Sequence, residues 1–298
     1  MFKKHNKINP GKKLIFLLGF SVSLLNFSCK SSPEIPEVNI FKLVDLTSTF
    51  TIYIPVQNNK EFVNSAFAQF SGFDENSVQK VTNISDEILI SLNKNQISGA
   101  VSGSFPSFAV KNVFSEKNGW NSRVFADSVF PINYYSSSNM KMQVSLVQPT
   151  SFLFAKEITP LLKNYDFQLK NIYKNEQIEN KEFYSAFVEN YFLEKNEGEI
   201  RFFSTSGKDF AKLLLKKNID LGIDHVKGKL LNSKAKNTFS LELEISLTNP
   251  QMIKAAAKLL KMALFPIPAK IEISGKNSIM ISDISLTYNE LLSLIGLS

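Results

Sequence analysis

Residues 238–247 (TFSLELEISL) form the most regular pattern in the chain, because polar and apolar side chains alternate there at every position. Neighbouring side chains of a β-strand point to opposite faces of a sheet, so this segment predicts a strand with one apolar and one polar face. Strands of parallel sheets are covered on both faces and are apolar throughout, which excludes a doubly wound parallel fold. We therefore expect an α+β fold, in which antiparallel sheets carry helices on one face.

The same order of elements is predicted for both halves of the chain. Periodicities of two and 3.6 residues, separated by turn residues, indicate the order β-α-β-β-α-β-β-α in residues 39–170 and again in residues 199–298. The helix over 249–265 has the clearest start, since Asn249 is a favourable N-cap and Pro250 suits the first helical position. The two segments share little sequence, so the element order alone predicts two tandem α+β modules.

Residues 171–198 are predicted to link the two modules. They are rich in charge and contain a helix that begins near Lys181. Phe183, Phe187 and Tyr191 follow one another at intervals of four residues, so they share one face of this helix. Two interpretations are open: the helix packs across both sheets, or its aromatic face forms one wall of a groove for an apolar ligand.

A long connection between predicted elements, residues 118–140, contains a second group of aromatic residues. Connections of this length in compact domains are often functional. Tyr134 and Tyr135 precede three serines and are expected to be exposed, where they would anchor a partner protein. The connection also contains Trp120, Phe125 and Phe130, and some of its aromatic residues are expected to pack inward.

A leader precedes the first module. Its basic start is followed by an apolar stretch of twelve residues, 14–25, which is too short to cross a hydrocarbon core of about 30 Å. This pattern is typical of a cleavable signal peptide, here over residues 1–28. Residues 29–38 contain two prolines and several polar side chains, and they are expected to form an extended tether.

The end of the leader, residues 25–29 (LNFSC), resembles the lipobox of bacterial lipoproteins. A serine stands before the cysteine, as the small residue of a lipobox does, and the bulkier Asn26 and Phe27 are similar to the relaxed lipobox of spirochaetal lipoproteins. The resemblance implies that a diacylglycerol is joined to the sulfur of Cys29, which becomes the N-terminus of the mature protein. Simple secretory cleavage, for example after Ser31, is the alternative.

The resemblance extends to the order of the elements. That order is similar to the one in uncharacterised, duplicated α+β lipoproteins of bacterial envelopes, and it implies no known activity. A lipoprotein of this kind is exported from the cytoplasm and held at a membrane, on the periplasmic or the outer surface, through its N-terminal acyl chains. We therefore expect a cell-envelope protein whose folded body stays close to a membrane.

The formal net charge of +7 belongs to the leader and not to the body. Residues 1–28 hold five of the 34 basic residues and none of the 27 acidic residues, so the remaining chain carries a charge of +2. A nearly neutral body lacks the basic surface that nucleic-acid-binding proteins use. We expect no nucleic acid among the partners.

Motifs for catalysis and metal binding are absent from the sequence. Cys29 is the single cysteine, and His225 is the single histidine beyond the leader, which excludes a Cys/His zinc site and an internal disulfide. Asp224 precedes His225 in a predicted strand and would point to the opposite face, where it could not orient the imidazole as in a catalytic triad. The sequence thus predicts a protein without catalytic residues, metals or cofactors.

A helix over residues 252–264 carries Lys254, Lys258 and Lys261 and has no acidic residue. These lysines form either the solvated side of a core helix or a face that touches anionic lipid headgroups beside the anchor.

Taken together, these patterns predict a non-catalytic binding or scaffold module for a partner protein or an apolar ligand. Two alternatives stay open. One is an envelope hydrolase that uses Ser/Lys or carboxylates, and the other is a structural spacer or surface antigen.

Overall fold

The computed structural model describes residues 35–71, 75–93, 96–174, 183–194, 198–209, 221–233, 235, 237–265 and 267–294. The predicted signal peptide and the predicted lipid site, Cys29, lie outside these residues, as does most of the predicted tether. Glu37–Ser298 form one compact unit, the body of the protein.

The strands of the body divide between its two halves. The first half contains β1 (Phe50–Pro55), β2 (Ser85–Asn93), β3 (Gln96–Gly103), β4 (Asn121–Phe125), β5 (Ile132–Ser137), β6 (Met142–Gln148) and β7 (Ser151–Ala155). The second half contains β8 (Ile200–Ser204), β9 (Ile223–Asn232), β10 (Thr238–Leu247), β11 (Lys270–Ser274) and β12 (Ser278–Thr287).

The helices connect and cover these strands. Those of the first half are α2 (Lys60–Ser71), α3 (Glu75–Asn83), α4 (Ser107–Val113) and α5 (Thr159–Lys174). α6 (Phe183–Leu193) lies between the halves in the sequence, and α8 (Ile253–Ala263) and α9 (Tyr288–Leu294) belong to the second half. Three short 3-10 turns are η1 (Ile40–Lys42), η2 (Glu116–Asn118) and η3 (Pro250–Met252).

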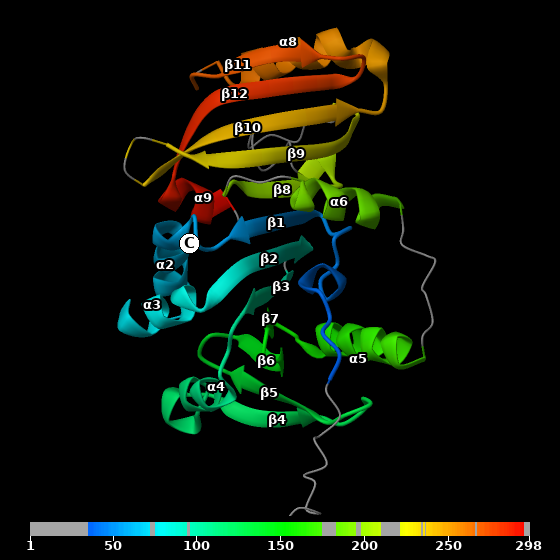
Figure 1. Cartoon of the computed structure of the whole chain (residues 1–298). Helices are drawn as coiled ribbons and strands as arrows, with labels where there is room; N and C mark the ends of the chain where they lie inside the picture. Colours follow the sequence, from blue (N-terminus) through cyan, green and yellow to red (C-terminus); the bar gives the residue numbers. More distant parts are fainter. Residues whose placement is uncertain are drawn as a thin grey trace, which may run out of the picture. The chain divides into compact units, whose positions relative to one another are not determined.

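All of these strands belong to one antiparallel sheet, in the order β11-β12-β10-β9-β8-β1-β2-β3-β7-β6-β5-β4 (Figure 1). β10 has the bounds of the alternating segment 238–247. The prediction of an antiparallel α+β fold is therefore confirmed.

The two halves meet where β1 pairs with β8, and we call this pairing the seam. Three residue pairs are in register there, with Tyr53 opposite Arg201 as one of them. Outward from the seam the strand order is the same on both sides, β1-β2-β3-β7-β6 and β8-β9-β10-β12-β11, and the hairpin of β4 and β5 extends the first half. The division into two modules stays a prediction, since one continuous sheet joins them.

Helices lie on both faces of this sheet, which corrects the expectation of a single covered face. α2, α8 and α9 pack against the face that carries Ile52 and Ile54 of β1. α5, α6 and the segment around η1 pack against the other face, which carries Tyr53. The expectation came from β10, which is polar on one face, whereas the central strand β1 is apolar on both faces and needs cover on each.

The core on the face of α2 and α8 is shared by both halves. Phe62 of α2 contacts the rings of Phe239 in β10 and Tyr288 in α9, with centroid distances of 5.2 and 5.3 Å. Buried residues of β1, β2, β9, β10 and β12 belong to the same hydrophobic cluster. Neither half therefore buries its apolar surface alone.

Cleavage between residues 174 and 183 is expected to leave the two halves associated, because the seam and the shared core hold them together. A protease site inserted there, followed by size-exclusion chromatography under native conditions, would test this. We expect the cut chain to elute with the volume of the uncut chain. Two fragments that separate and stay folded would show that each half has its own core.

Candidate binding surface

α8 lies over the edge of the sheet formed by β11 and β12 (Figure 1). Its start agrees with the sequence prediction, since the Asn249 side chain accepts a hydrogen bond from the backbone N–H of Gln251 at 3.0 Å, and Pro250 opens the preceding turn η3. The buried side chains of α8 recur at intervals of three and four residues, which places them on one helix face: Ile253, Ala256, Ala257 and Leu260.

The other side of α8 and its two ends expose large apolar residues next to lysines. We call this the α8 surface, and it consists of Met252, Lys254, Lys258, Leu259, Lys261, Met262 and Phe265. Phe265 is 87% exposed and Met262 is 66% exposed. Single exposed apolar residues are common on soluble proteins, but a group of them on one helix marks an interaction surface.

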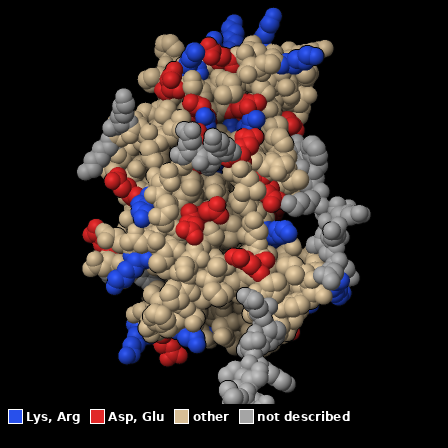
Figure 2. Space-filling model, viewed as in Figure 1, with Lys and Arg blue, Asp and Glu red and all other residues tan. Residues whose placement is uncertain are grey.

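The charge of the α8 surface is positive. Its three lysines are exposed, and α8 contains no acidic residue. In Figure 2, Lys and Arg side chains project at the end of the body where Figure 1 places α8 and β11. Glu272 of β11 is paired with Lys270 at 3.0 Å, so it does not leave a free negative charge beside the α8 surface.

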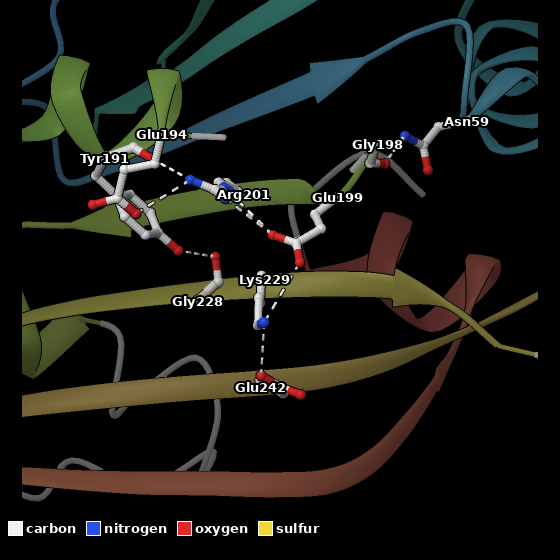
Figure 3. A network of polar contacts seen from close by, with 9 residues as sticks. All are labelled: Asn59, Tyr191, Glu194, Gly198, Glu199, Arg201, Gly228, Lys229 and Glu242. Atoms are coloured by element: carbon white, nitrogen blue, oxygen red, sulfur yellow. Dashed lines mark hydrogen bonds and ion pairs between the residues drawn. The ribbon is translucent and has the colours of Figure 1, made fainter. Parts of the chain in front are cut away.

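A second polar feature is a network centred on Arg201 of β8 (Figure 3). The Arg201 side chain is only 7% exposed, and its guanidinium donates hydrogen bonds to Glu199 and to the backbone carbonyl of Tyr191 in α6. Glu194 is 3.5 Å away, and the Tyr191 ring lies 5.4 Å from the guanidinium carbon. A buried guanidinium is tolerated where its donors are satisfied in this way.

The network continues across the sheet. Lys229 of β9 lies 3.5 Å from Glu199 and 3.1 Å from Glu242 of β10. Burial alone would lower the pKa of Lys229, but the hydrogen bonds and charges of these two glutamates raise it above its usual value. The Tyr191 hydroxyl donates to the carbonyl of Gly228 at 2.7 Å, and burial raises the pKa of this tyrosine. The contacts therefore hold α6 on the sheet.

The predicted aromatic face of α6 is packed against the sheet. Phe187 contacts the Phe203 ring at a centroid distance of 5.7 Å, and Tyr191 belongs to the network around Arg201. The side chain of Phe183 lies outside the described residues. Phe192, on the same helix, stacks on Tyr53 of β1. α6 thus contacts strands on both sides of the seam, as in the interpretation that this helix packs across both halves.

The predicted loop over residues 118–140 contains the hairpin of β4 and β5, and its tyrosines are not exposed anchors. Tyr135 is buried beside Phe114, with ring centroids 5.7 Å apart. Tyr134 is partly buried and packs on the opposite face. The expectation of exposure was wrong because Tyr134 and Tyr135 are neighbours in β5 and point to opposite faces of the sheet, and each of these faces is covered by other side chains. Trp120 of the same segment is buried, in line with the expectation that some of these aromatic residues pack inward.

Asp224 contacts His225, contrary to the sequence prediction. The Nδ1 atom of His225 lies 2.8 Å from a carboxylate oxygen of Asp224. The cause is a β-bulge, since Ser246 pairs with His225 while the next residue of β10 pairs with Ile223, which leaves Asp224 without a counterpart. A bulge interrupts the alternation of side chains, so neighbours in the sequence can meet.

The contact does not complete a catalytic triad. His225 stacks on Phe203, with ring centroids 5.4 Å apart, and contacts the edge of Phe187. Ser246 lies opposite His225, but its hydroxyl is near that of Ser278, at 3.4 Å. Among the described residues, no hydroxyl is hydrogen-bonded to the imidazole, which is the contact that a nucleophilic serine needs.

Replacement of His225 by alanine is expected to lower the free energy of unfolding by on the order of 1 kcal/mol, because it removes ring contacts with Phe203 and Phe187. His225→Phe keeps an aromatic ring and should lose less. Chemical denaturation of both variants would measure this. A hydrolytic activity with a bell-shaped pH profile, lost in His225→Ala at unchanged stability, would contradict a purely structural role.

Sequence reasoning missed the Arg201 network. Glu199 and Arg201 are two residues apart, and so are Glu242 and Glu244. The two members of each pair therefore point to the same face of the sheet, and this spacing was a usable signal of a charged face. Which strands become neighbours decides whether opposite charges meet, and local patterns do not contain that information.

None of the described helices is long and apolar enough to cross a membrane. The model of a protein family, described as the outer membrane-associated lipoprotein TP0453, matches residues 36–292 of the chain. No curated protein matches.

Solved structures of TP0453 share the fold. Crystal forms I, III and IV are each 17% identical to this chain, with TM-scores of 0.64, 0.61 and 0.59. The matches cover 88%, 87% and 87% of this chain, and 99%, 98% and 97% of the TP0453 chains.

Proposed function

Because the chain belongs to the family of the outer membrane-associated lipoprotein TP0453, we propose that it is a non-catalytic binding module that contacts anionic lipid through the α8 surface. The protein is a lipid-anchored cell-envelope lipoprotein of the spirochaetal type. Cys29 is the proposed site of lipid attachment, and the apolar ligand expected from the sequence is then the membrane itself.

The observation that carries this proposal is the exposure of Phe265 and Met262 beside Lys254, Lys258 and Lys261. Apolar side chains that lie in the interface, next to cations that attract anionic headgroups, are typical of helices that rest on a membrane. A protein partner would also suit an apolar surface. The three lysines of α8, with no acidic residue in the helix, favour a partner surface that is anionic, as the proposed lipid surface is.

The expected strength of the contact suits a protein that already has an anchor. Each lysine near an anionic surface contributes about 1 kcal/mol, and the exposed apolar side chains add a similar order of magnitude when they enter the interface. The α8 surface alone would bind weakly and reversibly. Its role would be to orient a body that the acyl chains retain.

The non-catalytic part of the proposal rests on the polar groups of the body. The charges around Arg201 are paired with one another, and the imidazole of His225 is packed between aromatic rings. Neither arrangement leaves a general base beside a nucleophile.

Replacement of Lys254, Lys258 and Lys261 by glutamine should weaken binding to anionic vesicles about 100-fold, since about 3 kcal/mol of attraction is removed. The measurement is co-sedimentation of the mature chain, made without lipid through Cys29→Ser, with phosphatidylglycerol vesicles at low salt.

A matched control removes the same charge elsewhere, from the exposed residues Lys42, Lys80 and Lys117. This control should bind as the unchanged protein does. Equal binding by both triple variants would show that the lysines of α8 are not the contact.

A further inference from the structure

The methionines of the body differ in their exposure to solvent. Five of the six methionines of the chain lie beyond the predicted leader. Met140 and Met142 are partly buried and pack against the hydrophobic cluster on the face of α2 and α8, and Met280 of β12 is partly buried as well. Met252 is 51% exposed and Met262 is 66% exposed, and both belong to the α8 surface.

The two exposed thioethers stand at opposite ends of α8. Met252 belongs to η3, directly before the helix, and Met262 lies in the last turn of the helix. Ten residues separate them, which corresponds to about 15 Å along a helix axis. The three lysines of the α8 surface lie between them in the sequence. When a helix of this kind rests on a membrane, its exposed apolar side chains enter the interface while its lysines stay at the headgroups.

A thioether that reacts with a peroxide becomes a sulfoxide. One oxygen atom passes from the peroxide to the sulfur, so that an S–O bond forms while the O–O bond breaks. The sulfur is oxidised by two electrons, and hydrogen peroxide is reduced to water. The product is polar, whereas the thioether is apolar. A sulfoxide must therefore give up hydrogen bonds with water to enter an apolar environment, which costs free energy.

We propose that Met252 and Met262 are modification sites, at which oxidation by a peroxide weakens the contact between the α8 surface and lipid. This inference rests on the proposed function of the α8 surface. The protein is held in the cell envelope, and compartments outside the cytoplasm are oxidising. The lysines of α8 do not react, so oxidation removes the apolar share of the contact and leaves the electrostatic share. Sulfoxide reductases reverse the modification.

The test is co-sedimentation of the mature chain carrying Cys29→Ser with phosphatidylglycerol vesicles, before and after treatment with hydrogen peroxide. Mass spectrometry of proteolytic peptides reports which methionines have gained oxygen. We expect Met252 and Met262 to be oxidised before Met140 and Met142. The lipid concentration that gives half-maximal binding should then rise about tenfold. Methionine sulfoxide reductases, with dithiothreitol as the reductant, should restore the original value.

Two double variants show where the effect arises. Met252→Leu combined with Met262→Leu keeps the apolar surface and removes both exposed thioethers, so this variant should bind as the unchanged chain does and keep its affinity after treatment. Met140→Leu combined with Met142→Leu is the matched control, and it should lose affinity as the unchanged chain does. Equal losses in the two variants would overturn the inference, because the effect would then come from another site.

The remaining outcomes separate this inference from the proposed function. If both methionines of the α8 surface are fully oxidised and sedimentation is unchanged, the inference fails and the proposed function stands. Slower oxidation of Met252 and Met262 than of the partly buried methionines would also overturn the inference. If the untreated chain does not sediment with the vesicles, the proposed function fails and the inference fails with it.

Discussion

Replacement of Cys29 by serine is expected to release the protein from the membrane fraction. Two acyl chains contribute about 0.8 kcal/mol for each buried CH₂ group, which far exceeds what the α8 surface can supply, and a serine hydroxyl cannot form the thioether that holds them. Detergent phase partitioning of whole cells would measure the effect. The variant should move from the detergent phase to the aqueous phase, or accumulate as an unprocessed precursor.

A control variant keeps the cysteine and changes the residue two positions before it in the proposed lipobox, Phe27→Ala, which removes bulk near the cleavage site. This variant should remain in the detergent phase. Partitioning of Cys29→Ser that is identical to that of the unchanged protein would contradict lipidation at Cys29 and favour simple secretory cleavage.

Replacement of Arg201 by methionine is expected to lower the free energy of unfolding by about 3–5 kcal/mol. Methionine keeps most of the apolar volume of the stem but removes the charge, so Glu199 loses its 3.2 Å partner while it stays largely buried. The hydrogen bond to the backbone carbonyl of Tyr191 is also lost, and with it a contact that holds α6 on the sheet. Chemical denaturation monitored by circular dichroism would measure the loss.

The chain offers a matched control, because Arg123 is its only other arginine and lies exposed on the edge strand β4. Arg123→Met should change the free energy of unfolding by less than about 0.5 kcal/mol. A similar small effect in Arg201→Met would show that the network is not a clamp and that α6 is held by its apolar contacts alone.

Features that depend only on neighbouring residues could be predicted from the amino-acid sequence. The alternation over 238–247 predicted β10 and the antiparallel sheet, and Asn249 with Pro250 predicted where the helical segment of α8 begins. The leader and its cysteine predicted a lipoprotein. In each case the physical cause lies within about ten residues, since strand alternation, helix capping and the apolar stretch of a signal peptide are local properties.

Features that depend on contacts between residues distant in the chain became visible only in the folded protein. β1 and β8 form the seam although nearly 150 residues separate them in the chain. Their pairing places Arg201 beside Tyr53 and brings apolar residues of both halves into one hydrophobic cluster. At the bulge, Asp224 is an extra residue of β9 between the residues that pair with Ser246 and Leu247 of β10, so the face of His225 could not be predicted from the sequence of β9 alone. Alternation specifies two faces for each strand, but only the choice of neighbouring strands and their register decides what each face meets.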